Sequence, residues 1–180
     1  MRTVTAGLFH SVDGIVEAPN EWQFDSFDAE MGEELGAMIG RVDTVILGRV
    51  GYEQWSSYWP TAEDDGFAAF INPVRKYVAS TTLTGTLEWE NATLVNGDLI
   101  RFVEELKSTD GGEIAVCGGI AIVRSLFFAG LIDSLTLMTH PVIAGSGRRL
   151  FEPGDPPTRL ELQSFRTTSA GNTITTYGVR

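Results

Sequence analysis

The chain has 180 residues, of which 43% are hydrophobic and 21% charged, a balance typical of one folded globular domain. The formal net charge of -11 argues against a general nucleic-acid or anionic-membrane surface, because binding to phosphate requires net attraction. One cysteine cannot form an internal disulfide, and with only two histidines we expect no metal site. The N-terminal apolar stretch is short for a signal peptide and no run approaches a membrane span, so a cytoplasmic protein is expected.

The first third of the chain predicts a strand, a loop, a helix and then a second strand. Apolar residues at alternate positions predict a strand over residues 3–9, and a loop rich in turn residues follows over residues 10–24. Over residues 25–39 apolar side chains recur at helical spacing, and acidic residues fill the first turns, where the helix dipole favours them. A short apolar strand is expected over residues 44–47, and a short helix over residues 49–56.

The middle of the chain continues this alternation after an aromatic and acidic connection. Residues 57–73 show little period and predict no regular element. Short strands are expected over residues 76–79 and 93–95, and Asp98 is the predicted N-cap of a helix that runs to residue 106. Residues 113–116 predict a further strand, and a Gly-Gly turn then leads into another helix.

The last third changes character, because polar and apolar residues alternate along each predicted strand. These strands cover residues 134–139, 159–163 and 173–179, and Ser-Ala-Gly-Asn at residues 169–172 predicts a hairpin turn. Residues 1–180 are therefore predicted to form a single α/β domain with three layers, helix, sheet and helix. Its mixed sheet would be mostly parallel and would close with an antiparallel hairpin at the C-terminus.

Two junctions between a predicted strand and a helix carry glycine, at LGRVGYE (residues 47–53) and VCGGIAI (residues 116–122). At the start of a helix the first N–H groups lack partners and the dipole adds positive charge, so a phosphate can bind there. Glycine allows close approach of a ligand, and Arg49 would add a charge-assisted contact. Turns that serve packing alone are the other interpretation, and neither junction matches G-x-G-x-x-G or the P-loop pattern.

A third predicted strand end carries hydroxyl side chains, at Ser80, Thr81 and Thr82. These hydroxyls would hydrogen-bond a sugar or a monophosphate, or would only terminate the sheet. In open α/β sheets ligands bind at the carboxyl ends of the strands, where all three junctions are expected to lie. The sequence therefore predicts a ligand site at this edge of the sheet.

The order of these motifs resembles the dihydrofolate reductase-like family, in the subgroup of the reductase (RibD C-terminal) domain of riboflavin biosynthesis. The resemblance runs through nearly the whole chain. It rests on SVDG, LGRVGYE, VASTTL, VCGGIAIVRSLFFAGLIDSLTL and HPVIAGSGRRLF, of which the last two are the most specific. It implies a dihydrofolate reductase-like fold, binding of NADPH, a small-molecule substrate and a homodimer.

The resemblance also implies which residues bind the cofactor. They are Gly48, Arg49, Gly51, Ser80, Thr81, Thr82, Gly118, Gly119, Ile120 and Ala121. The first three would meet the pyrophosphate or the adenosine phosphate, the three hydroxyl residues the 2′-phosphate and ribose, and the last four the pyrophosphate. The family pattern Gly-Arg-x-Thr-x-Glu has a threonine where this chain has Gly51, which still offers a backbone N–H.

Candidates for the chemical step lie after the first strand and at the start of the first helix. The carboxylates of Asp13, in SVDG, and Asp28, which follows Trp22, are candidates for proton relay or substrate anchoring, with Asp25 and Glu30 as alternatives. The other interpretation is structural: Asp13 would belong to a turn, and the acids near residue 28 would be partners of the helix dipole.

Three further side chains, His10, Arg148 and Arg149, have both a structural and a functional interpretation, whereas Cys117 has a structural one alone. His10 ends the first strand and would either be structural or face the site, and Cys117 is predicted to be a small buried hydrophobic residue. Arg148 and Arg149 lie in a glycine-rich loop, where the resemblance implies contact with a phosphorylated or acidic substrate. A solvated pair of charges is the alternative.

The sequence and the resemblance together predict an NADPH-dependent reductase. Its acceptor would be a small heterocycle, pteridine- or pyrimidine-like, or a carbonyl compound. The alternative is a protein on the same fold that binds a nucleotide or another ligand without turnover, and a structural dimer without a nucleotide site is a third interpretation. The aromatic residues between positions 52 and 70 would form a lid over an aromatic substrate, a subunit contact or a packed core.

Overall fold

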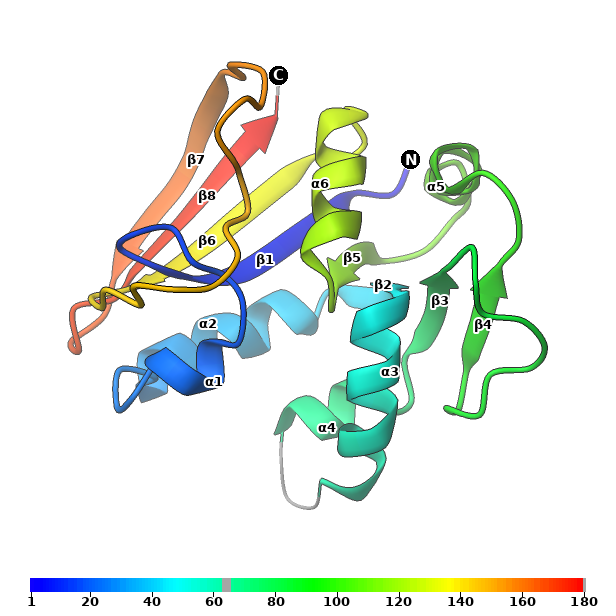
Figure 1. Cartoon of the computed structure of the whole chain (residues 1–180), viewed down its shortest axis with the longest axis horizontal. Helices are drawn as coiled ribbons and strands as arrows, with labels where there is room; N and C mark the ends of the chain where they lie inside the picture. Colours follow the sequence, from blue (N-terminus) through cyan, green and yellow to red (C-terminus); the bar gives the residue numbers. More distant parts are fainter. Residues whose placement is uncertain (63–65, 180) are drawn as a thin grey trace.

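The computed structural model describes residues 1–62 and 66–179 and contains an eight-stranded sheet (Figure 1). The strands are β1 Val4–Ser11, β2 Val42–Gly48, β3 Arg75–Ala79, β4 Ala92–Val95, β5 Glu113–Cys117, β6 Ser134–His140, β7 Leu160–Thr167 and β8 Thr173–Val179. Their order across the sheet is β4-β3-β2-β5-β1-β6-β8-β7. Pairing is parallel from β4 to β6, and it is antiparallel between β6 and β8 and between β8 and β7.

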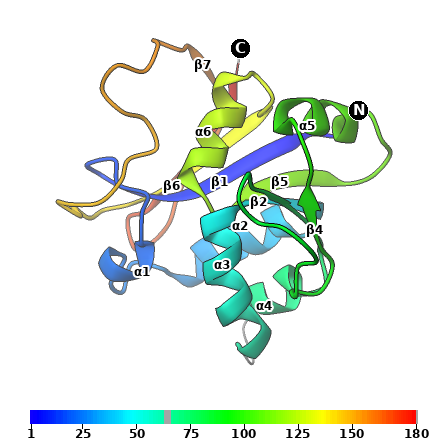
Figure 2. The same cartoon turned by 45° about the vertical axis from the view of Figure 1, so that its right-hand side comes forward.

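Helices cover both faces of this sheet (Figures 1 and 2). They are α1 Pro19–Trp22, α2 Ala29–Ile39, α3 Arg49–Tyr58, α4 Gly66–Ile71, α5 Leu99–Lys107 and α6 Ile120–Phe128, with a 3₁₀ turn, η1, at Trp59–Thr61. In Figure 1 α5 and α6 lie on one side of the strands, and α1, α2, α3 and α4 lie on the other. The arrangement confirms the predicted three-layer α/β fold with a mostly parallel mixed sheet.

Each face of the sheet has its own apolar core. Ile46 and Leu47 are successive residues of β2, and their side chains enter opposite clusters because side chains alternate along a strand. Ile46 belongs to the cluster that contains Leu126 of α6, whereas Leu47 belongs to the cluster that contains Tyr52 of α3. The unbroken apolar run of β2 is therefore explained by burial on both faces.

The helix predicted from residue 25 and the loop before it differ in detail from the structure. The helix begins at Ala29, because the Asp28 carboxylate accepts the backbone N–H of Met31 at 2.8 Å and caps the helix. The predicted loop over residues 10–24 contains α1, which begins at Pro19, a residue whose fixed φ suits a first helical turn.

The connection over residues 57–73, for which no element is predicted, contains η1 and α4. Trp59 and Phe67 have ring centroids 4.9 Å apart, and Trp55 of α3 meets both rings edge to face. Aromatic contacts of this kind add stability beyond the buried area. The chain changes from α to 3₁₀ geometry at Trp59. The aromatic residues therefore do not keep one helical spacing through this segment, and the sequence pattern does not indicate α4.

The predicted hairpin turn joins β7 to β8. Gly171 adopts a φ of 86° in this turn, a conformation that favours glycine. β7 is longer than the predicted 159–163 and lies at the edge of the sheet. Most of its side chains are exposed, including Leu162 and Phe165.

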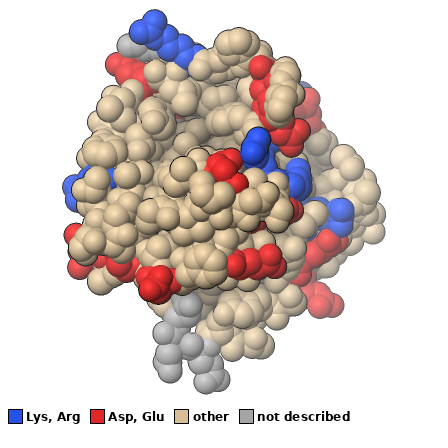
Figure 3. All heavy atoms as spheres, turned by 60° about the vertical axis from the view of Figure 1, so that its left-hand side comes forward, with Lys and Arg blue, Asp and Glu red and all other residues tan. Residues whose placement is uncertain are grey.

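Charged side chains are spread over the surface. Figure 3 shows one face of the molecule, on which acidic and basic side chains are interspersed and uncharged surface predominates. The acidic balance of the chain therefore does not create one continuous charged patch on this face.

A buried lysine joins α4 to β3. The Lys76 side chain is fully buried, and its ammonium donates hydrogen bonds to the carbonyl oxygens of Ile71 at 2.8 Å, Asn72 at 2.6 Å and Val74 at 2.8 Å. The same nitrogen lies 4.6 Å from the centroid of the Trp89 ring. All three donors are thus used, and they satisfy carbonyl groups at the C-terminal end of α4 that no helical N–H reaches.

Replacement of this lysine tests that interpretation. We expect Lys76→Met to lower the free energy of unfolding by about 2–4 kcal/mol, because buried carbonyl groups lose their donor. Arg75→Met, at an exposed position of the same strand, is the control and should change stability by less than about 0.5 kcal/mol. Urea denaturation of both variants measures the difference, and equal stability of the two would contradict the role of Lys76.

Candidate functional site

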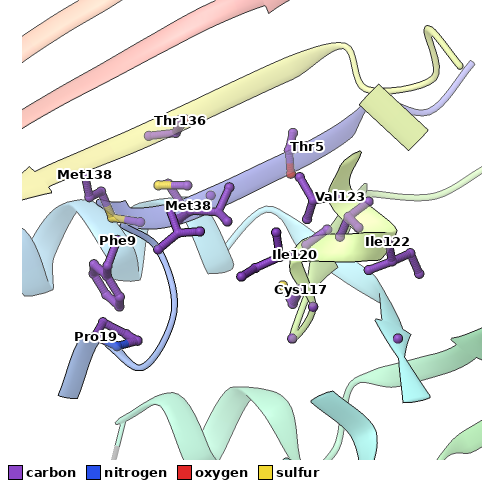
Figure 4. Close-up of a pocket in the computed structure, with 18 of the residues that line it drawn as sticks. Thr5, Phe9, Pro19, Met38, Cys117, Ile120, Ile122, Val123, Thr136 and Met138 are labelled. Atoms are coloured by element: carbon purple, nitrogen blue, oxygen red, sulfur yellow. The ribbon is translucent and has the colours of Figure 1, made fainter. Parts of the chain in front are cut away.

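A cavity of about 1970 Å³ includes the carboxyl ends of β2, β3 and β5 and extends along the sheet to the first residues of β2, β5 and β6. On one side its lining comes from the ends of β2, β3 and β5 and from the first turns of α3 and α6, and on the other from β1, α1, α2 and β6. Figure 4 shows both sides: Cys117 and Ile120 at the turn from β5 to α6, and Phe9, Met38 and Met138 across from them. The cavity opens at the edge of the sheet where the sequence predicts a ligand site.

Two helices begin at the cavity without a side-chain cap. Asp28 and Asp98 cap α2 and α5 with their carboxylates. By contrast, Gly48 precedes α3 and Gly119 precedes α6, and neither helix start has a side-chain hydrogen bond. The first-turn N–H groups of α3 and α6 therefore remain for a ligand or water, and both helix starts line the cavity.

The backbones at these two helix starts are in close contact. We call Gly48, Gly118 and Gly119 the glycine wall. A Cβ on Gly119 would lie 3.8 Å from Gly48 Cα, and one on Gly118 would lie 2.9 Å from Leu47 Cδ2. A Cβ on Gly51 would lie only 1.5 Å from the carbonyl oxygen of Gly118. Glycine at position 51 is thus required by the approach of α3 to the β5–α6 turn.

This contact explains the departure from the Gly-Arg-x-Thr-x-Glu pattern. A threonine at position 51 would collide with the Gly118 carbonyl, so the two backbones could not lie as they do. Gly51 is buried and does not line the cavity, whereas the other nine residues predicted for cofactor binding do.

Replacing Gly51 by alanine should lower the stability of the fold, although the same replacement within a helix usually raises it. We expect Gly51→Ala to lower the melting temperature strongly, with a loss of more than about 2 kcal/mol, because the β5–α6 turn must move. Gly36→Ala is the matched control, since a Cβ on Gly36 of α2 meets nothing within 4 Å and alanine favours a helix. A thermal melt in which both variants match the wild type would contradict the contact.

Arg49 contributes a positive charge on the side of the cavity that the glycine wall forms. Its Nη1 donates a 2.7 Å hydrogen bond to Glu53 Oε2 one turn later in α3, and the two side chains are 43% and 45% exposed. Such an exposed pair contributes little to stability, which leaves the guanidinium able to contact a ligand. Arg49 lines the cavity beside Gly48.

The three hydroxyl residues at the end of β3 also line the cavity, with different roles. Ser80 Oγ accepts the backbone N–H groups of Thr82 at 3.1 Å and Leu83 at 2.9 Å, so this hydroxyl closes the turn after the strand. Thr81 and Thr82 are exposed, and Thr82 Oγ1 lies 3.4 Å from Ser80 Oγ. Of the three, the threonines are better placed to contact a ligand.

The opposite side of the cavity is apolar. We call Phe9, Phe27, Met38 and Met138 the apolar wall, which β1, the start of α2, α2 and β6 provide. Phe9 and Phe27 meet edge to face with centroids 5.8 Å apart, and Met138 is buried in the cluster against which Phe9 packs. In Figure 4 Pro19 of α1 lies beside Phe9, so α1 borders this wall.

Asp13 is engaged in hydrogen bonds that join two loops. Its carboxylate accepts the Ser11 hydroxyl at 2.7 Å and the backbone N–H groups of Ala144 and Gly145, both at 2.9 Å. These hydrogen bonds, that from Ser11 first, lower the pKa of Asp13 to about 2. Asp13 does not line the cavity, and its geometry supports the structural interpretation of the SVDG turn.

The lowered pKa of Asp13 predicts how its contribution to the free energy of unfolding depends on pH. The folded-state pKa is below the ordinary value of 3.8, so the stabilisation is present above about pH 4 and is lost as pH falls towards 2. The difference in unfolding free energy between the wild type and Asp13→Asn should therefore shrink over this interval. Urea denaturation at several pH values measures it, and a constant difference would show that the Asp13 carboxylate is not stabilised as an anion.

Asp28 also has structural partners and does not line the cavity. Besides capping α2 it accepts the backbone N–H of Ala170 at 3.2 Å and the Asn172 side-chain amide at 3.3 Å. It thus joins the first turn of α2 to the hairpin between β7 and β8. The structure does not bring Asp13 and Asp28 together at the cavity.

A buried histidine that the sequence analysis did not single out supports the α1 segment. His140 is fully buried at the end of β6, and burial lowers its pKa. Its Nε2 lies 2.9 Å from the Gln23 amide nitrogen and its Nδ1 lies 2.7 Å from Ser26 Oγ. A neutral ring that accepts from Gln23 and donates to Ser26 satisfies both contacts. Gln23 itself lines the cavity.

The remaining candidates lie in different surroundings. His10 is partly buried, and its Nδ1 lies 3.3 Å from the Thr139 hydroxyl. Cys117 lines the cavity, and burial raises the pKa of its thiol to about 12, so the thiol is neutral, as expected of a hydrophobic residue. Arg148 lines the cavity, whereas Arg149 packs its side chain against Gly14.

Within the described residues, no three or more His, Cys, Asp or Glu side chains gather in a way that could hold a metal ion. No helix in residues 1–62 and 66–179 has both the length and the apolar character needed to cross a membrane.

Comparisons with known proteins agree with this fold. A family model described as the RibD C-terminal domain matches residues 2–174. The protein YyaP of Bacillus subtilis (strain 168), itself uncharacterized, is 29% identical over 176 residues, covering 94% of this chain and 91% of YyaP. A structure from Shewanella sp. PV-4, of a protein assigned to riboflavin biosynthesis, has a TM-score of 0.79 at 19% identity and 99% coverage of both chains.

A dihydrofolate reductase also shares the fold. The enzyme from Enterococcus faecalis, solved with NADP(H) and RAB-propyl, has a TM-score of 0.61 at 13% identity, covering 99% of this chain and 96% of the enzyme. Together with the preceding structure it confirms the dihydrofolate reductase-like fold that the motifs predict.

Proposed function

The chain belongs to the RibD C-terminal domain family, a family of reductases, and from that premise we propose that it binds NADPH and transfers hydride to a small acceptor. A pteridine- or pyrimidine-like heterocycle and a carbonyl compound are the acceptor classes that fit this proposal. The observation that carries it is the pair of uncapped helix starts that meet at the glycine wall of the cavity.

The residues at the glycine wall suit a dinucleotide. A pyrophosphate has negative charge on both phosphates, and the starts of α3 and α6 supply N–H groups and partial positive charge to both. Gly48 and Gly119 leave room for the phosphates, while Arg49 adds a full positive charge. Thr81 and Thr82 present hydroxyls at the neighbouring strand end. The Enterococcus faecalis enzyme of similar fold was solved with NADP(H), which supports the choice of ligand.

Bound NADPH would supply the hydride, and the chain would position the reactants. The glycine wall would hold the phosphates, and the apolar wall would hold the acceptor on the far side of the same cavity. Buried Met138 and the partly buried Phe9 limit the access of water there. Holding two reactants in contact removes much of the entropic barrier to their reaction.

The second candidate function is ligand binding without turnover. It is favoured by one observation: the carboxylates of Asp13 and Asp28 are engaged with backbone and side-chain donors outside the cavity lining. Such a protein would bind NADPH at the glycine wall and would not oxidise it. Oxidation of NADPH with a panel of pteridines, pyrimidines and carbonyl compounds separates the two functions.

A thermal-melt titration with NADPH and NADH tests the shared claim of nucleotide binding. NADPH at 100 times its dissociation constant should raise the unfolding free energy of the wild type by about 2.7 kcal/mol. Arg49→Ala should weaken NADPH binding about tenfold, because a charge-assisted hydrogen bond is lost. The matched control is Arg101→Ala, since Arg101 forms the same kind of exposed pair with Glu105 one turn later in α5.

Each outcome of this titration has a clear meaning. A melting shift in the wild type and in Arg101→Ala that is reduced in Arg49→Ala supports binding at the glycine wall. Equal shifts in all three proteins would place the nucleotide elsewhere. No shift with either nucleotide at millimolar concentration would refute the proposal.

A further inference from the structure

A second aromatic surface of the cavity lies beside the glycine wall. Trp55, Trp59 and Phe67 line the cavity from α3, η1 and α4. Trp55 lies next to the glycine wall, since a Cβ on Gly118 would be 3.7 Å from Trp55 Cδ2. A ligand between Trp55 and the apolar wall would therefore meet aromatic rings and methionine side chains, which are polarisable surfaces suited to flat rings.

Two acidic side chains of the lining are neutralised by arginines. Glu34 of α2 accepts a 2.5 Å hydrogen bond from Arg166 of β7, and Glu113 of β5 accepts one of 2.7 Å from Arg41. Each carboxylate is balanced by its guanidinium partner, so neither pair adds net charge to the lining.

The rim beside α1 carries a negative balance. Glu17 and Glu21 are exposed and line the cavity at this rim. The Glu17 carboxylate also accepts the backbone N–H of Arg148 at 3.0 Å, so one arginine and two acids share this part of the lining. A phosphorylated or carboxylated acceptor would meet net repulsion on entry, whereas an uncharged acceptor would not.

The source of the proton that accompanies hydride transfer also limits the choice of acceptor. Reduction by hydride needs one proton in addition. Asp13 and Asp28 lie outside the lining with their carboxylates engaged, and the carboxylates of Glu17 and Glu21 are exposed at the rim beside α1. Hydride addition to a quinone gives a hydroquinone anion, whose phenol-type oxygen has a pKa of about 10 and takes its proton from water at neutral pH. Such an acceptor needs no acid from the protein, unlike one that must be protonated before hydride transfer.

We propose, on the basis of the function proposed above, that the acceptor is an uncharged, flat, carbonyl-conjugated ring of the quinone class, bound between the apolar wall and Trp55. The balanced reaction is quinone, NADPH and one proton giving hydroquinone and NADP⁺. Two electrons pass with the hydride, and the proton comes from solvent.

A matched pair of acceptors tests the proposal. 2-Methyl-1,4-naphthoquinone and 1,4-naphthoquinone-2-sulfonate share the ring system and differ in charge. We expect the uncharged quinone to give a kcat/KM at least about tenfold higher in NADPH oxidation. Dihydrofolate and an aminopyrimidine ribosyl phosphate complete the panel. Binding without NADPH is measured by quenching of tryptophan fluorescence, because Trp55 and Trp59 line the cavity.

A charge placed in the apolar wall gives a second test. Met38→Lys should weaken binding of the uncharged quinone about tenfold and favour the sulfonate. The control is Val12→Lys, at an exposed apolar position outside the cavity lining, which should change neither by more than about threefold. Met38 lies outside the glycine wall, so the NADPH melting shift of each variant shows that the fold and nucleotide binding are retained.

The outcomes separate this inference from the reductase assignment. Preference for the uncharged quinone in the wild type, reversed by Met38→Lys alone, supports it. Faster turnover of the sulfonate, dihydrofolate or the phosphorylated pyrimidine would overturn it and leave the reductase function standing. An NADPH melting shift without oxidation by any acceptor would overturn both and support the ligand-binding alternative.

Discussion

The contact between the backbone of α3 and the backbone of the β5–α6 turn sets the shape of the cavity. Gly51 lies against the Gly118 carbonyl at a distance that leaves no space for a side chain, and Gly119 lies close to Gly48. Because β2 and β5 are parallel neighbours, their carboxyl ends bring two helix starts to the same wall. The concentration of unpartnered N–H groups at that wall follows from this packing, and the proposed nucleotide site depends on it.

Much of the fold could be predicted from the sequence because local patterns agree with the tertiary structure. The alternating pattern in β6 and β8 and the apolar run of β2 reflect burial on one face or on both. The helix start at Ala29 was harder to predict, since Asp25 and Asp28 are equally good caps by residue type. Only the hairpin that donates to Asp28 distinguishes them, and it lies far along the chain.

The two sides of the site differ in how well the sequence predicts them. Glycines at strand ends are a local signal, and the glycine wall lies where that signal indicates. The apolar wall is assembled from β1, the start of α2, α2 and β6, so no short motif contains it. Nor does any local pattern reveal that His140 supports Gln23, because a single histidine at a strand end has no distinctive spacing. The carboxylates of Asp13 and Asp28 were plausible by type, yet their hydrogen-bond partners come from distant loops.

The position of β1 in the sheet has a consequence for how the chain folds. This strand precedes the other seven of the sheet in chain order, yet it lies near the centre, with Val4 beside Ile114 of β5 and Ser11 beside His140 of β6. Its partners become available only after most of the chain has left the ribosome, and pairing between such distant segments carries a large loop-closure cost. We expect β2 and β3 to associate early through local contacts and the sheet to close late, when β1 enters between β5 and β6.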